Sequence, residues 1–169
     1  VAVTIAGLPY RCPAAPYEGA LLIDHFFRKK GLRDRVEVEF FTPEPAPLPV
    51  AGTGIGDAVK DLFRRRDITF NSGMKLAKVD SDNNEMLFED GRRYAFDLLV
   101  TIPQHRVSRV VKESGLAGET GWVDVDRFTL ATAVPNVYAL GDSTFIKLAS
   151  GLPLPKAGVF AHGQAQVVA

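Results

Sequence analysis

The single cysteine of the chain is the residue whose position most directly suggests chemistry. Cys12 lies between Arg11 and Pro13, and the apolar pattern that follows predicts a helix from Pro13 to Lys30, with Pro13 as its first residue. A thiol at the start of a helix lies at the positive end of the helix dipole, and the adjacent arginine adds positive charge. Both effects favour the thiolate, the nucleophilic form of cysteine. A buried structural cysteine is the alternative that these residues leave open.

A Gly-Asp pair near the C-terminus is the second place where chemistry is expected. The apolar run Val137 to Leu140 predicts a buried strand, and it leads directly into Gly141 and Asp142. Glycine lets the backbone come close to a ligand, and a carboxylate that follows a buried strand can accept hydrogen bonds from a hydroxylated ligand. An ordinary Gly-Asp turn after a strand is the alternative interpretation.

The elements that would position these residues follow an α/β pattern. Strands at Val1–Ile5 and Val36–Phe41 flank the helix Pro13–Lys30, and this order suggests a parallel βαβ unit. The pattern then predicts a helix, a strand, an antiparallel meander, another strand and another helix, at residues 57–66, 67–70, 74–94, 96–102 and 104–115. We therefore predict an α/β fold, a Rossmann-like three-layer domain with a parallel sheet and an antiparallel β-meander.

Composition and charge exclude several classes of function. The 169 residues include 20 basic and 20 acidic side chains, so no net charge attracts an anionic membrane, and we expect no nucleic-acid partner. No apolar run is long enough to span a bilayer, and the N-terminal stretch lacks the basic region of a signal peptide. One cysteine excludes an internal disulfide, and with three scattered histidines it predicts no metal site.

The segment VPNVYALGDST, which ends at Thr144, resembles the second FAD fingerprint of the pyridine nucleotide-disulfide oxidoreductase superfamily. Thr132, residues 136–139 and the Gly-Asp pair carry the resemblance. It implies that Asp142 binds the ribityl chain of FAD and that Gly141 allows this close approach.

The stretch GLPYRCPAAPYEGALL, which begins at Gly7, resembles the Cys-Pro-x-Ala-Pro-Tyr-Glu segment of the sulfide:quinone oxidoreductase and flavocytochrome c sulfide dehydrogenase group. The resemblance implies that Cys12 is one of a redox-active pair of cysteines that handle sulfide sulfur beside the flavin. It also implies a substrate, sulfide or another small sulfur donor, and an acceptor, a quinone or a cytochrome haem. In that group a nearby glutamate has been considered an acid or base, a role that would fall to Glu18. A capping role in the first turn of the helix is the alternative for Glu18.

The C-terminal stretch LPLPKAGVFAHGQAQVVA predicts a helix from Lys156 onward. It resembles a Pro-Lys-x-Gly-x-x-Ala segment that places the N-terminus of a helix against the flavin ring. The resemblance implies that Lys156, Ala157 and Gly158 lie at the cofactor, where main-chain N–H groups would stabilise negative charge. A solvated surface lysine is the alternative for Lys156.

The N-terminal part lacks the requirements of a nicotinamide site. Residues Gly7 to Pro13 contain one glycine where a Gly-x-Gly-x-x-Gly turn is needed, and the strand Val36–Phe41 ends without an acid for an adenosine ribose. NAD(P)H is therefore not the expected electron donor. The glycines from Gly52 to Gly56 follow a proline-rich loop, and we expect them to form a flexible turn that starts the helix at Asp57.

The resemblance covers essentially the whole chain and implies two domains. Residues 1–103 resemble the NAD-type, second dinucleotide-binding domain, and residues 104–169 resemble the returning C-terminal part of the FAD-binding domain. No first FAD fingerprint precedes them. We therefore expect the chain to be a fragment that lacks the N-terminal FAD-binding half, binds no FAD and is inactive by itself.

For the full-length protein, the resemblance implies an FAD-dependent oxidoreductase that oxidises sulfide through Cys12 and passes electrons through FAD to quinone. We expect a cytoplasmic location, and peripheral membrane association and an oligomeric state are left open. Two alternatives remain. One is a flavoenzyme like type II NADH:quinone dehydrogenase, and the other is a non-catalytic interaction domain with a degenerate dinucleotide-binding fold.

Overall fold

The computed structural model describes the whole chain, residues 1–169, and divides it into two compact units. Unit 1 consists of Val1–Tyr10 and Ala14–Gln104, and unit 2 consists of Arg11–Pro13 and His105–Ala169. The short segment Arg11–Pro13 thus belongs to unit 2, although it interrupts the sequence of unit 1. Because Cys12 lies in this segment, its partners are those of unit 2.

Unit 1 is built on a four-stranded sheet in which all strands are parallel. In spatial order these strands are β3 (Ile68–Asn71), β2 (Val38–Phe41), β1 (Ala2–Ile5) and β7 (Leu99–Ile102). Helix α1 (Ala15–Lys29) connects β1 to β2, and helix α2 (Thr53–Arg65) connects β2 to β3. The βαβ unit predicted from the sequence is therefore confirmed.

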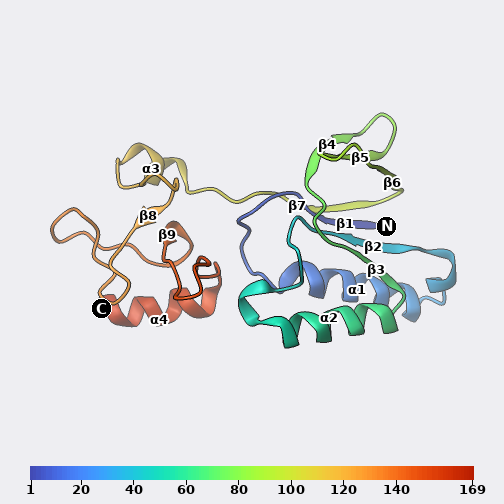
Figure 1. Ribbon diagram of the computed structural model, residues 1–169, viewed down its shortest axis with the longest axis horizontal. Helices are drawn as coiled ribbons and strands as arrows, with labels where there is room; N and C mark the ends of the chain where they lie inside the picture. The colour runs from blue at the N-terminus through green and yellow to red at the C-terminus, as the bar shows by residue number, and fades with distance from the viewer. The chain divides into compact units, whose positions relative to one another are not determined.

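Different elements cover the two faces of this sheet (Figure 1). Helices α1 and α2 lie on one face, where Phe40 and Phe63 belong to a buried apolar core. An antiparallel meander packs on the other face, where Phe41 and Phe88 belong to a second core. Successive residues of a strand point to opposite faces, so the adjacent Phe40 and Phe41 serve the two cores.

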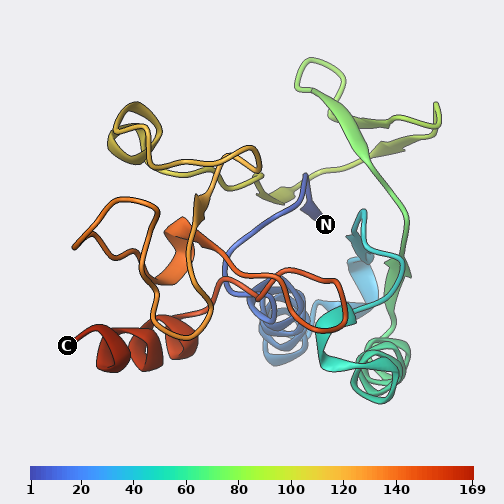
Figure 2. The ribbon, with the colours of Figure 1, turned by 60° about the vertical axis from the view of Figure 1, so that its left-hand side comes forward.

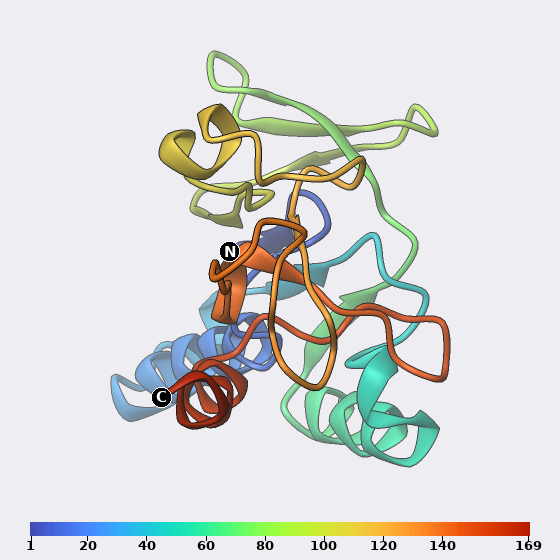
Figure 3. The same cartoon turned by 90° about the vertical axis from the view of Figure 1, so that its left-hand side faces the viewer.

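The meander forms a separate sheet of three strands, β4 (Leu76–Asp80), β5 (Glu85–Phe88) and β6 (Arg93–Ala95). Viewed from the side, unit 1 shows helices, parallel sheet and meander as successive layers (Figure 3). The three-layer α/β fold and the meander predicted from the sequence are confirmed.

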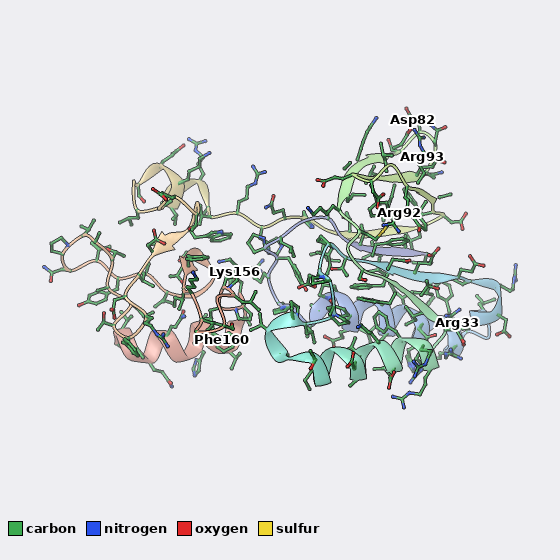
Figure 4. The ribbon with its side chains drawn as sticks, viewed as in Figure 1. Arg33, Asp82, Arg92, Arg93, Lys156 and Phe160 are labelled. Carbon is green, nitrogen blue, oxygen red and sulfur yellow. The ribbon has the colours of Figure 1, made fainter.

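A buried acidic side chain ties together the C-terminal ends of α1 and α2. Asp24 is fully buried and accepts hydrogen bonds from Arg33 at 2.7 Å, Arg28 at 2.9 Å and Arg66 at 3.3 Å. Arg33, labelled in Figure 4, also donates to the main-chain oxygens of Arg66 and Asp67. Burial alone would raise the pKa of Asp24, but the hydrogen bonds from Arg33 and Arg28 hold it below its ordinary value.

Helix α2 begins earlier than the sequence predicts. It starts at Thr53, and Gly56 is buried within it. A Cβ atom on Gly56 would lie only 2.8 Å from the main-chain oxygen of Pro47. Glycine therefore lets the helix pass close to the proline-rich loop, and the prediction of a flexible turn from Gly52 to Gly56 is wrong.

Unit 2 contains short elements joined by long loops (Figure 2). Its elements are helix α3 (Arg109–Glu113), strand β8 (Val123–Asp124), the 3₁₀ turn η3 (Gly141–Ser143), strand β9 (Thr144–Phe145) and helix α4 (Gly158–Val168). Strands β8 and β9 pair in parallel. Residues on and around this pair, among them Trp122 and Val123, are buried.

Two elements of unit 2 differ from the sequence prediction. The helix expected over residues 104–115 is confined to α3, because Ser108 has an extended backbone and its side-chain oxygen caps the first turn. The run Val137–Leu140 is not a strand. Tyr138 pairs with Ala131 in an isolated bridge, and more than half of its surface is exposed, so the prediction of a buried strand is wrong.

Candidate functional site

Cys12 lies in a short segment that pairs with residue 156. Its N–H donates to the main-chain oxygen of Lys156 at 2.7 Å, and Arg11 and Lys156 form a parallel bridge. The φ angle of Cys12 is 59°, in the left-handed region, and α1 begins only at Ala15. The prediction that Pro13 is the first helical residue is therefore wrong. The helix dipole acts within the first turn of a helix, and Cys12 lies before the first turn of α1. The thiol is exposed, so the alternative of a buried structural cysteine is also wrong.

Lys156 connects several parts of the candidate site (Figure 4). Its Nζ donates to the main-chain oxygens of Asp142 at 2.8 Å and Thr144 at 3.0 Å. The same atom lies 3.3 Å from the centre of the Trp122 ring, which is a cation–π contact. Burial lowers the pKa of Lys156 to about 8, and the nearby charge of Asp142 acts in the opposite direction. The prediction of a helix from Lys156 onward is wrong at its start, because α4 begins at Gly158.

The Gly-Asp pair opens the turn η3 and packs against α4. Gly141 has a φ of 69°, and a Cβ atom there would lie 3.1 Å from the Cβ of Ala161. The Gly141 N–H donates to the side-chain oxygen of Gln164 at 2.6 Å. Glycine is thus required here for the approach of a helix, a reason that the sequence does not reveal. The Asp142 side chain stays one-third exposed, with Oδ2 at 3.7 Å from Nε of Arg11.

The start of α4 presents main-chain N–H groups without a side-chain cap. Ala157 occupies the N-cap position in an extended conformation, and its methyl group accepts no hydrogen bond. A cavity of about 10 Å³ lies beside this helix start, and its lining includes Gly141, Asp142, Lys156, Ala157 and Phe160. Four of the five predicted cofactor residues therefore meet at one place, and the fifth, Gly158, follows directly in the chain.

Glu18 belongs to a different compact unit from this group. It lies in unit 1, in the first turn of α1, and its side chain is exposed. A carboxylate at this position interacts favourably with the positive end of the helix dipole. Cys12 belongs to unit 2, so the two predicted catalytic residues lie in different units. The acid or base role of Glu18 stays a prediction.

Unit 1 contains a buried carboxylate of which the sequence pattern gives no sign. Glu44 follows β2 in the proline-rich loop, is 7 % exposed, and accepts hydrogen bonds from the hydroxyls of Tyr17 at 2.9 Å and Tyr10 at 3.1 Å. Burial raises the pKa of Glu44, and the hydrogen bonds from the tyrosines oppose this. Burial and the charge of Glu44 raise the pKa of both tyrosines. In dinucleotide-binding folds an acid beyond the second strand binds the ribose, but here the carboxylate is already engaged by protein hydroxyls.

The residues around Lys156 fit one side of a site for a hydroxylated and anionic ligand such as a dinucleotide. The Asp142 carboxylate is exposed enough to accept hydrogen bonds, and the N–H groups at the start of α4 are not capped. The cavity itself has room for about one water molecule. These residues can therefore form only one wall of a cofactor site.

The structure shows neither a metal site nor a membrane-spanning helix. Nowhere do three or more histidine, cysteine, aspartate or glutamate side chains gather as metal ligands. None of the helices combines the length and the apolar character that crossing a membrane requires.

Comparison with known proteins gives consistent matches. A family model described as pyridine nucleotide-disulphide oxidoreductase matches residues 25–165, a range that includes Asp142 and Lys156 and begins after Cys12 and Glu18. Mitochondrial sulfide:quinone oxidoreductase from Mus musculus is 32% identical over 153 residues, which are 83% of this chain and 32% of that protein. The corresponding protein from Dictyostelium discoideum is 28% identical over 170 residues, which are 98% of this chain and 36% of that protein. The chain thus spans about a third of the length of these relatives.

The solved structures that resemble the chain show the same fold. The sulfide:quinone oxidoreductase from Aquifex aeolicus has a TM-score of 0.73 at 24% identity, over 93% of this chain and 38% of that one. Because the identity is low, this likeness concerns the fold, and the roles of individual residues rest on the geometry described above.

Proposed function

The chain belongs to the pyridine nucleotide-disulphide oxidoreductase family, and from this premise we propose that its protein oxidises sulfide at Cys12 and passes the electrons through FAD to a quinone. One observation carries the proposal. The exposed thiol-bearing segment is hydrogen-bonded to the main chain of Lys156, and the side chain of Lys156 is hydrogen-bonded to the turn that contains Asp142. The likeness to sulfide:quinone oxidoreductases supports this choice of substrate and acceptor.

The reaction at the thiol requires a second cysteine, because Cys12 is the only one among these residues. In the proposed step, hydrosulfide attacks a disulfide between Cys12 and that cysteine. The old S–S bond breaks, a new S–S bond joins the sulfide sulfur to one cysteine, and the other cysteine leaves as a thiolate. The exposure of Cys12 gives a small anion access to this bond.

The cofactor would be held by Asp142, through hydrogen bonds to its hydroxyl groups, and by the uncapped N–H groups at the start of α4. When bound, FAD would supply the acceptor for the two electrons that sulfide gives up. Unit 2 would then correspond to the returning part of an FAD-binding domain, and unit 1 to the NAD-type domain.

A nicotinamide donor is the competing proposal, because unit 1 has the fold of a dinucleotide-binding domain. Two observations argue against it. The turn after β1 lacks the glycines that let backbone approach a pyrophosphate. Glu44, the carboxylate that follows β2, is buried and bonded to Tyr10 and Tyr17, so a ribose would have to displace these hydroxyls.

The experiment is an anaerobic titration of the protein expressed from the complete reading frame that contains these residues. Sulfide should bleach the flavin absorbance, and NADH should not. Cys12→Ser should keep the flavin bound and lose the bleaching by sulfide. Bleaching by NADH alone would replace the proposal by an NADH dehydrogenase, and normal reduction of Cys12→Ser by sulfide would remove Cys12 from the reaction.

Glu18→Gln separates the two roles considered for Glu18. If the carboxylate moves a proton, the pH profile of reduction by sulfide should change. If it only interacts with the helix dipole, the variant should lose about 0.3–1 kcal/mol of stability and keep the profile. The exposed position of Glu18 in the first turn of α1 favours the second result.

A further inference from the structure

Lys156 contacts the cysteine segment through its main chain. Its carbonyl oxygen accepts the N–H of Cys12 at 2.7 Å, and Arg11 and Lys156 form a bridge of the parallel type. The contact joins residues that are far apart in the sequence and that lie in the same compact unit. The left-handed backbone of Cys12 thus has a hydrogen-bond partner two residues before the start of α4.

Lys156 contacts the η3 turn through its side chain. An ammonium group has three N–H donors. Two hydrogen bonds go to the main-chain oxygens of Asp142 and Thr144, and the group also lies on the face of Trp122, which is 8 % exposed. A lysine that bound a cofactor through hydrogen bonds would need free donors, and two of the three donors of Lys156 are used within the protein.

These contacts carry one inference. We propose that Lys156 is a positioning residue, which holds the Cys12 segment with its main chain and the Asp142 turn with its side chain, so that the two keep a fixed separation. Trp122 is the platform that keeps the ammonium group in place. Without the ammonium group, the main-chain oxygens of Asp142 and Thr144 would lose these hydrogen bonds, and the turn would no longer be tied to the side chain of residue 156.

For catalysis, the inference rests on the proposed function. If Cys12 and Asp142 serve the thiol and the flavin, Lys156→Met should slow reduction of the flavin by sulfide and leave oxidation of the reduced flavin by quinone unchanged. The structural claim can be tested without any activity, so failure of the proposed function and failure of the positioning role can be told apart.

The test uses two features of the chain. It contains one cysteine and one tryptophan, so a naphthalene-sulfonate acceptor attached to Cys12 reports energy transfer from Trp122 alone. We expect Lys156→Met to broaden the distribution of Trp122 fluorescence lifetimes in the labelled 169-residue chain. Lys156→Arg, which keeps a cation with several donors, should restore a narrow distribution, and Lys147→Met, which changes an exposed lysine nearby, should behave as the wild type. A wild-type distribution in Lys156→Met would overturn the proposal.

A second measurement applies if Lys156→Met does not fold. Deprotonation of Lys156 weakens its hydrogen bonds to the turn, so the lifetimes in the labelled wild-type chain should broaden as the pH rises past about 8. The other charged or titratable side chains around the Cys12 segment are those of Arg11, Asp142 and His105. The thiol of Cys12 does not titrate in this experiment, because it carries the label. Lys156→Arg keeps its charge across this range and should show no such broadening. Constant lifetimes in the wild type would contradict the positioning role.

Discussion

The ammonium group of Lys156 lies 3.3 Å from the centre of the ring of Trp122 and donates hydrogen bonds to the main-chain oxygens of Asp142 and Thr144. The aromatic face and the two oxygens compensate the charge, but burial still lowers the pKa of Lys156 to about 8. Lys156 is therefore charged at neutral pH, and burial of this charge lowers the free energy of unfolding by an amount that depends on pH.

This cost predicts how stability varies with pH. The pKa of Lys156 is about 8 in the folded chain and 10.5 ordinarily, so between these values the unfolded chain binds more protons. The contribution of Lys156 to the free energy of unfolding should therefore rise as the pH increases from 8 to 10.5. Urea unfolding followed by circular dichroism should show a steeper rise in the wild type than in Lys156→Met. Lys147→Met, an exposed control, should keep the wild-type slope, and equal slopes in the wild type and Lys156→Met would contradict the assignment.

Gly141 should tolerate substitution less well than Gly151, which also has a positive φ but has free space where a Cβ atom would lie. Gly141 and Gly151 both have positive φ, but only at Gly141 would a Cβ meet another atom, Cβ of Ala161 at 3.1 Å. Each change to alanine should cost roughly 1–2 kcal/mol for the left-handed backbone. Gly141→Ala should lose more, because α4 must move away from the turn. The difference between the two variants in chemical denaturation measures the helix contact, and a difference of zero would show that α4 does not press on the turn.

Local sequence patterns predict most of unit 1. The alternation in β2 places Phe40 and Phe41 on opposite faces, and this pattern requires a sheet that is covered on both sides. The end of α1 is also readable, because basic residues in its last turn precede Gly31, which adopts a positive φ. These features depend on residues close together in the sequence.

The candidate site depends on contacts that no local pattern records. Cys12 does not adjoin the first residue of α1, and its N–H is bonded to Lys156, near the other end of the chain. In the sequence, Glu44 is one residue of a proline-rich loop, and only the fold brings Tyr10 and Tyr17 to it. The role of Trp122 is hidden for the same reason, since its partner, Lys156, is distant in sequence.

The buried Asp24 should be important for the stability of unit 1. It compensates three arginines, of which Arg33 is the most buried, and it links α1 to the end of α2. Asp24→Asn removes the charge and leaves the guanidinium groups close together without their common partner, which should cost about 3 kcal/mol. The exposed pair of Asp61 and Arg64 is the matched control, and Asp61→Asn should change stability by less than about 1 kcal/mol. Equal losses in thermal or urea unfolding would mean that burial of Asp24 adds nothing to its ion pairs.

Glu44 should give unit 1 a pH dependence of the opposite sign to that of Lys156. Burial raises its pKa above the ordinary value of 4.5, so above pH 4.5 the folded chain holds the proton more tightly than the unfolded chain does. The contribution of Glu44 to the free energy of unfolding should fall as the pH rises from 4.5 through the folded-state pKa. Glu44→Gln cannot titrate and should lack this fall, whereas Glu89→Gln, which changes an exposed glutamate, should retain it. Unfolding at a series of pH values by circular dichroism makes the comparison, and a Glu44→Gln curve parallel to the wild type would mean that the buried carboxylate keeps its ordinary pKa.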